Sequence, residues 1–317
     1  MRVFLRLNVL ILVFGTLFMT GCAVRGQRET KYRVTTAPLK EATLQQLVGV
    51  INTSATHLQT LNASVDIDAS AGGERKGKVT DYRQVSGYVL VRKPEMLRMI
   101  LLAPVVRSRL VDMVSDGRKF QLAITTPSQS KFYVGSNQQT GKPSPQPLEN
   151  MRPQHIFDAL LLKAIDPQDE LAVLEQSTEL VRDPKTKKDA VEPDYIVVVI
   201  RRDQNGSYLS RKIVFNREDL LPHEQYIYNR QGELVTYARY DNFTDYGGTM
   251  FPTHVQIQRP VEEYAITLTM LKVRLNEPLT NDQFVLTQPP GSKLINLDEK
   301  TTSAGNQPSP PSPEGKR

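Results

Sequence analysis

The sequence SGYVLVRKPEMLRMILLAPVVRSRLVDMVSDGRKFQLAITTPSQSKFYVG, residues 86–135, contains five short apolar runs separated by turn residues. Asp116-Gly117 stands between two of these runs and is typical of a tight β-hairpin, because both residues accept a positive φ. Pro94 and Pro104 mark other turns. The stretch therefore predicts an antiparallel meander of five strands: Gly87–Val91, Met96–Leu102, Arg109–Val114, Lys119–Ile124 and Lys131–Val134.

Several of the predicted strands are apolar on both faces. Ile100-Leu101-Leu102 and Val105-Val106 are consecutive apolar residues, whereas a sheet with one wetted face alternates apolar and polar side chains. We therefore expect the second face of the sheet to be covered by other elements or to line an apolar cavity.

Two stretches have helical periodicity. Pro38–Leu61 repeats apolar residues at helical spacing, and its proline suits the first turn of a helix. Leu148–Leu162 has an apolar arc that is wide for a surface helix, so both of its sides are expected to contact apolar groups.

The second half of the chain returns to β periodicity. In Glu262–Leu275 the apolar residues change face after Met270, which predicts a bulge or a strand buried on both sides. No shift in composition divides the strands into two sets, so we expect a mainly β (α+β) fold with a single large curved antiparallel sheet. The further predicted strands are Asn62–Ala71, Leu171–Val181, Asp194–Arg202, Tyr208–Asn216, Glu224–Tyr228, Leu234–Tyr240, Phe251–Arg259 and Glu262–Leu275.

The N-terminus has the features of an export signal. Two arginines precede an apolar segment that is too short to span a bilayer comfortably, and the segment ends LFMTGC at Cys22. This ending resembles the bacterial lipobox, in which the cysteine receives lipid; the alternative is an ordinary signal peptide with a chance cysteine. Because Cys22 is the only cysteine, no intramolecular disulfide is expected.

The composition bounds the class of protein. Apolar residues make up 39% of the chain and charged residues 23%, which is typical of a globular domain. The net charge of +6 comes from scattered basic residues, so nucleic acid is not expected as a partner. The chain is expected to comprise a lipoprotein signal peptide (1–21), a tether (22–37), one globular domain (38–298) and a disordered Pro/Ser-rich tail (299–317).

The sequence contains no recognisable reaction centre. The histidines are far apart without metal-ligand spacing, and neither a G-x-S-x-G motif nor a phosphate-binding glycine loop is present. Asp66 and Asp68 lie on one strand face, but a solvated face explains them better than a carboxylate pair. Asp241 and Asp245 are interpreted as polar groups of a loop. We therefore predict no catalytic residues, no metal and no cofactor.

Four segments resemble the LolA/LolB-like periplasmic lipoprotein carriers and receptors. LRMILLAPVVRSRLVDM (97–113) is similar to the receptor branch, and VSDGRKFQL (114–122) resembles the hairpin that follows. FPTHVQIQRP (251–260) and ITLTMLKVRLNEPLTNDQFVLTQPPG (266–291) resemble the closing strands. The resemblance covers 38–298. The chain departs from the family in having no Trp and in its inserts at 137–147 and 182–193.

The resemblance implies a half-open β-barrel whose concave apolar face is covered by helices and holds acyl chains. It also implies that Val105 and Val106 occupy a loop that touches the membrane. Helix 148–162 would be a lid or, equally well, a core helix. The candidate cavity or lid residues are Met99, Leu101, Ile156, Leu160, Leu161 and Met270.

The leading hypothesis is a non-enzymatic lipoprotein that binds the acyl chains of lipids or lipoproteins, with a periplasmic carrier protein as a possible partner. By resemblance, Ala23 after Cys22, in place of Asp, implies the outer membrane, facing the periplasm. The alternative is a structural or scaffolding lipoprotein that binds a protein partner of the cell envelope. A hydrolase with an unrecognised site is the third and weakest reading.

Replacing the lipidated cysteine tests the anchor. Cys22→Ser is expected to release the protein from membranes, because no other segment is long and apolar enough to hold it. The measurement is fractionation at high salt. A variant that remains in the membrane fraction would show that lipid on Cys22 is not what holds the protein.

Overall fold

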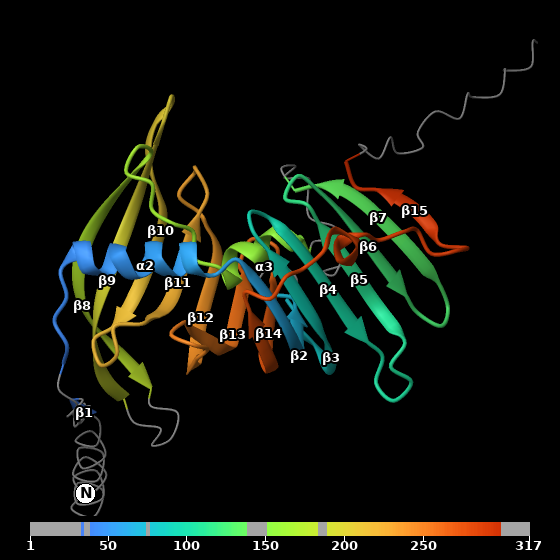
Figure 1. Cartoon of the computed structure of the whole chain (residues 1–317), viewed down its shortest axis with the longest axis horizontal. Coiled ribbons are helices and arrows are strands. Elements are labelled where there is room, and N and C mark those ends of the chain that lie inside the picture. Colours follow the sequence, from blue (N-terminus) through green and yellow to red (C-terminus); the bar gives the residue numbers. More distant parts are fainter. Residues whose placement is uncertain (1–32, 35–38, 74–76, 138–150, 183–188, 299–317) are drawn as a thin grey trace, which may run out of the picture. The chain divides into compact units, whose positions relative to one another are not determined.

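The computed structural model describes residues 33–34, 39–73, 77–137, 151–182 and 189–298 (Figure 1). The chain divides into two compact units. The larger contains residues 37–177 and 193–317, and the smaller contains residues 1–36 and 178–192. In the smaller unit, β1 pairs in parallel with β9 through Arg33–Ala190 and Val34–Val191.

The described residues form one sheet of fifteen strands. From β9 the order runs β10-β11-β12-β13-β14-β2-β3-β4-β5-β6-β7-β15, and β8 pairs with β9. The strands are β1 Arg33–Val34, β2 Thr60–Ala71, β3 Thr80–Arg92, β4 Met96–Leu102, β5 Arg109–Ser115, β6 Lys119–Thr125, β7 Ser130–Ser136, β8 Glu170–Arg182, β9 Asp189–Asp203, β10 Gly206–Asn216, β11 Pro222–Tyr228, β12 Leu234–Asp245, β13 Met250–Arg259, β14 Tyr264–Leu275 and β15 Lys293–Asn296.

The single mainly β sheet is confirmed, but the prediction of a purely antiparallel sheet is wrong. β15 pairs with β7 in parallel, as β1 does with β9, so the sheet is mixed. The sheet is also open, because the strands at the two ends of its order do not pair with each other. Parallel pairing needs a long connection, and β15 reaches β7 only after the chain has built seven further strands.

The predicted meander is present as β3 to β7, with each strand antiparallel to the next. At its central hairpin Gly117 has φ 89°, a left-handed conformation that favours glycine. The Asp116 carboxylate accepts hydrogen bonds from the backbone N–H groups of Arg118 and Lys119. The hairpin is therefore fixed by local chemistry that the sequence displays directly.

Helix α2 spans Leu44–His57 and is shorter than the predicted Pro38–Leu61. It begins after Thr43, whose hydroxyl accepts from Gln46 N–H while the Gln46 side chain accepts from Thr43 N–H. This capping box satisfies backbone donors that the first turn leaves free. At the other end, Leu58 is already extended.

Helix α3 spans only Pro153–Leu160, although 148–162 was predicted to be helical. Residues 148–150 lie outside the described part of the chain. Arg152 is extended because the residue before a proline is excluded from the helical region. Leu161 is extended as well, and its burial beyond the end of the helix explains why the apolar arc of 148–162 looks wide in the sequence.

Both helices lie on the same face of the sheet. Register places Val197, Ile213, Gln225 and Ala238 in one row across β9 to β12, and directly paired residues point to the same side. Leu47 and Ile51 of α2 belong to the core cluster of Val197 and Ile213. The α3 residues belong to the cluster of Ala238, and Gln225 donates a hydrogen bond to the carbonyl of Asp158 in α3.

The predicted change of face in β14 is a bulge. The pairing of β14 with β2 shifts register between Met270 and Lys272. Leu271 at the shift is 59% exposed, whereas Met270 is buried. The extra residue therefore keeps Val273 and Leu275, which pair with Ala63 and Leu61 of β2, on the same face as Met270, where they pack against the same core cluster.

A polar cluster fixes the first turn of α3. Arg259 of β13 is buried, pairs with Glu262 through two hydrogen bonds, and donates to the Thr236 hydroxyl. It also donates to Nε2 of His155 in α3 over 3.2 Å. Because a guanidinium only donates, His155 has to present a neutral nitrogen there. Burial, and then the charges of Arg259 and Arg152, hold the pKa of His155 well below its usual value.

This contact predicts that stability falls in mild acid. The pKa of His155 is lower in the folded chain than the ordinary value of about 6.5 in the unfolded chain, so below that pH the unfolded state binds more protons. The contribution is therefore fully present above pH ~6.5 and is lost as pH falls towards the folded pKa, by up to about 1.4 kcal/mol per pH unit.

The difference in free energy of unfolding between the wild type and His155→Gln, measured in urea at pH 7.5 and pH 5, isolates this effect. Carboxylates elsewhere titrate in both proteins and cancel. The wild type is expected to lose its advantage at pH 5. An advantage that is the same at both pH values would contradict the account.

Candidate functional site

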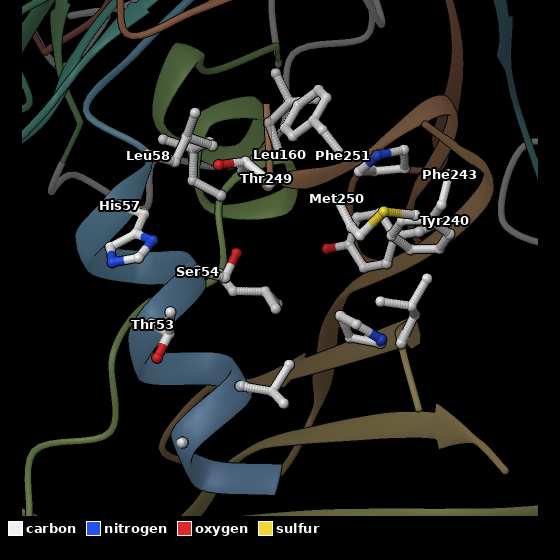
Figure 2. A pocket seen from close by; sticks show the side chains of 18 of the residues that line it. Thr53, Ser54, His57, Leu58, Leu160, Tyr240, Phe243, Thr249, Met250 and Phe251 are labelled. Atoms are coloured by element: carbon white, nitrogen blue, oxygen red, sulfur yellow. The ribbon is translucent and has the colours of Figure 1, made fainter. Parts of the chain in front are cut away.

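A pocket of about 440 Å³ lies between α2, the end of α3 and strands β11 to β13 (Figure 2). Figure 2 shows α2 on one side and the side chains of Tyr240, Phe243 and Met250 on the other. This volume is within the range of small-molecule sites. The lining residues are Gln46, Gly49, Val50, Thr53, Ser54, His57, Leu58, Lys93, Leu160, Leu161, Leu162, Leu221, Pro222, Tyr240, Phe243, Gly248, Thr249, Met250, Phe251 and Pro252.

Helix α2 separates its core contacts from its pocket contacts by helical periodicity. Leu47, Ile51 and Ala55 are buried. Val50 and Thr53 lie on the neighbouring stripe and line the pocket. Val50 is 37% exposed, which is unusual for a valine in the middle of a helix that packs against a sheet. The exposed valine is explained by the pocket that it lines.

The α3 wall consists of Leu160, the last residue of the helix, and the two leucines that follow it. Leu160 and Leu161 are buried and Leu162 is half-buried, and all three line the pocket. The segment that follows is fixed to α2, because the Asn52 side chain exchanges two hydrogen bonds with the backbone of Ile165. The two helical walls are therefore held together by a direct polar contact.

The sheet wall is aromatic. The Tyr240 hydroxyl donates to the carbonyl of Ala159 over 2.6 Å, so its buried polar group is satisfied while the ring lines the pocket. Burial raises the pKa of Tyr240, which keeps the phenol neutral at physiological pH. Phe243, Met250 and Phe251 complete this wall on the β12–β13 hairpin. Such a wall offers contact area to an apolar ligand.

The described residues show no grouping that points to a metal site. Among them, no set of three or more His, Cys, Asp or Glu side chains could hold a metal ion. Asp66 accepts a hydrogen bond from Ser86, Asp241 pairs with Arg239, and Asp245 accepts from the backbone of Gly248. These contacts place the three carboxylates in roles that stabilise strands and turns.

The sequence-predicted site residues lie in three places. Leu160 and Leu161 line the pocket, whereas Met99, Leu101, Ile156 and Met270 lie in the core cluster and do not line it. Val105 and Val106 lie at the tip of the β4–β5 loop, and Cys22 lies outside the described residues.

The valine tip is open to water. Val105 is 97% exposed and Val106 75% exposed. Val105 has φ 70°, a conformation that a β-branched residue rarely adopts, and Val106 N–H donates to the carbonyl of Pro104 across it. Arg107 beside the tip is exposed too, and Arg109 is 63% exposed at its side chain. The loop therefore presents apolar and basic groups together.

Sequence reasoning missed most of the pocket. Phe243 lies between Asp241 and Asp245, which are interpreted as polar groups of a loop, and Val50 lies within the predicted helix without being singled out. A usable signal was the position of Val50 beside the stripe formed by Leu47, Ile51 and Ala55. That stripe alone is enough to pack α2 on a sheet, so a further apolar residue next to it indicates a second apolar contact. Lys93 lines the pocket and donates a hydrogen bond to the carbonyl of Ala55, a contact between separate parts of the chain that no local sequence pattern indicates.

Comparison with known proteins finds similar solved structures at low sequence identity. A family model described as "Uncharacterized protein" matches residues 173–288, and no curated protein matches the chain. The chain is similar to a LolA superfamily protein from Nitrosomonas europaea, with 17% identity, 78% of this chain and 99% of that chain covered, and a TM-score of 0.46.

Two other solved structures are similar. One is a DUF1329 family protein from Desulfovibrio piger (14% identity, 76% and 95% of the chains covered, TM-score 0.47). The other is a putative outer membrane lipoprotein-sorting protein domain from Vibrio parahaemolyticus (9% identity, 76% and 97% covered, TM-score 0.42). The similar solved structures therefore include a protein of the LolA superfamily, which the sequence resembles. Similarity at this level does not carry a ligand or a partner to this chain.

Proposed function

We propose that this chain is a non-enzymatic lipoprotein that binds the acyl chains of lipids or lipoproteins. The observation that carries the proposal is the pocket, whose walls are leucine, valine, methionine and aromatic side chains on three sides. In this proposal Cys22 is acylated and anchors the chain to the outer membrane, facing the periplasm. The sheet face under α2 and α3 is the concave side of a half-open barrel.

The physical logic is transfer out of water. An exposed acyl chain costs about 0.8 kcal/mol for each CH₂ group, so a membrane lipid does not cross an aqueous compartment unaided. A preformed apolar pocket replaces water around the chain without requiring the protein to unfold. Within the described residues, neither helix has the length and apolar character needed to cross a membrane.

A charge placed in the pocket tests acyl binding. Val50→Glu puts a carboxylate on a partly exposed wall, so α2 is expected to remain folded while affinity for a neutral fluorescent acyl ester falls at least about tenfold, since an apolar chain cannot compensate a desolvated charge. Fluorescence titration measures the affinity, and thermal melting measures the fold.

Leu271→Glu is the matched control, because Leu271 is exposed at the β14 bulge and does not line the pocket. It is expected to bind the ester like the wild type. If wild type and both variants bind the ester equally, or none binds it, the pocket is not an acyl site. The scaffolding alternative is then favoured.

The β4–β5 loop is the proposed membrane contact. Its two valines lie in water in the free protein, where each exposed Å² of apolar surface costs about 25 cal/mol, and they gain that energy on entering a bilayer. Arg107 and Arg109 lie where they can pair with lipid phosphates, as in other interfacial segments that combine apolar and basic residues, although Arg109 also pairs with Asp112 at 3.1 Å in the free protein.

Replacing Val105 and Val106 with serine is expected to slow delivery of a fluorescent acyl cargo to liposomes several-fold. The fold and the bound cargo are expected to remain, because both side chains are exposed. Stopped-flow transfer and thermal melting are the measurements. Unchanged transfer would exclude the membrane role, and a large fall in melting temperature would place the valines in the core.

A further inference from the structure

One lysine stands among the apolar walls of the pocket. Lys93 follows β3 directly and lines the pocket beside Leu58. Its ammonium donates a hydrogen bond to the carbonyl of Ala55, in the last turn of α2. The side chain is half-buried, and this burial lowers the pKa of Lys93 below its ordinary value.

Among the described residues, the lining of the pocket includes no negative side chain that could balance this cation. None of the lining residues is Asp or Glu, and the ionisable side chain that α2 itself contributes to the lining is His57. In the part of the chain that the structure describes, Lys93 makes no ion pair with a carboxylate; its polar contact is the Ala55 carbonyl. A half-buried ammonium without a counter-charge is costly, and an anionic ligand would remove that cost.

Lys93 lies at one end of the α2 wall of the pocket. The α2 wall extends from Gln46 to Leu58, roughly 18 Å of helix at ~1.5 Å rise per residue. Lys93 contacts the Leu58 end of the α2 wall through the carbonyl of Ala55. Leu221 and Pro222 belong to the sheet wall of the pocket. Polar side chains occur along the whole α2 wall, but the cation lies at one end only, which matches an amphiphile with one tail and a charged head group.

We propose that the pocket binds an amphiphile with a single acyl chain and an anionic oxygen head group, the chain along α2 and the head group at Lys93. This rests on the proposed acyl-binding function and narrows it. An ammonium has three donors, and the Ala55 carbonyl uses one, so two remain for a carboxylate or a phosphate. The acyl chains of a lipidated protein, carried on neutral ester and amide bonds, fit this end less well.

Lys93 also has a structural role that the test has to separate from ligand binding. Its charge lies at the C-terminal end of α2, where the helix dipole favours a cation and free carbonyls need donors. A variant that only loosened α2 would weaken every ligand. A variant that removed a head-group contact would weaken the anionic ligands alone.

Competition by three C16 ligands against a neutral fluorescent acyl ester is the experiment, with the full chain of wild type, Lys93→Met and Lys93→Arg. Palmitate and hexadecyl phosphate are expected to bind the wild type about tenfold more tightly than hexadecanol, the gain typical of one hydrogen bond between charged groups. Lys93→Met is expected to lose this preference with its affinity for hexadecanol unchanged, and Lys93→Arg is expected to keep it.

The outcomes are distinguishable. Hexadecanol binding as tightly as both anions in the wild type overturns the proposal while leaving acyl binding intact. Equal weakening of all three ligands in Lys93→Met also overturns it and leaves Lys93 a capping role. Failure of all three ligands and of the ester contradicts the proposed function itself. A preference confined to one anion supports the proposal and names the head group.

Discussion

The structure depends on covering one apolar face of an open sheet. Register aligns buried side chains across neighbouring strands, and that face has to be removed from water by other elements. Helix α2 covers β9 and β10, and α3 packs against β4 and β5 as well as β12 and β13. The pocket arises because two short helices do not fill the space between them.

Polar contacts fix the positions of these helices in addition to apolar packing. Asn52 connects α2 to the segment after α3, and Arg259 fixes the first turn of α3 through His155. Arg211 of β10 is buried, pairs with Glu170 at 2.7 Å and donates to the carbonyl of Ala164. Removing one partner of such a buried pair is costly, so these contacts specify one arrangement of the walls.

The sequence predicted the strands well because their signals are local. Met96–Leu102 agrees with the observed β4 at both ends, since Pro94 and Pro104 mark its limits. The helices were predicted too long, because buried extended leucines such as Leu161 look like helix to a periodicity argument. β15 was missed because its pairing with β7 joins segments far apart in the chain.

The candidate site was only partly accessible to the same reasoning. Leu160 and Leu161 were identified from an apolar surplus, and both line the pocket. Met99 and Met270 were included on the resemblance to a family cavity, yet they fill the core here. The pocket combines α2, α3 and a distant hairpin, and no local pattern indicates which apolar residues remain unpacked. The position of Lys93 follows from its contact with Ala55, which only the folded chain reveals.

The central claim is that the space between the helices and the sheet holds an acyl chain. Native mass spectrometry of the protein extracted from its own membranes, without added lipid, tests this most directly. The account predicts a folded species heavier than the chain with its anchor by the mass of one acyl-chain amphiphile, which is released on unfolding. A folded species that carries only its own anchor, under conditions gentle enough to retain lipid, would contradict it.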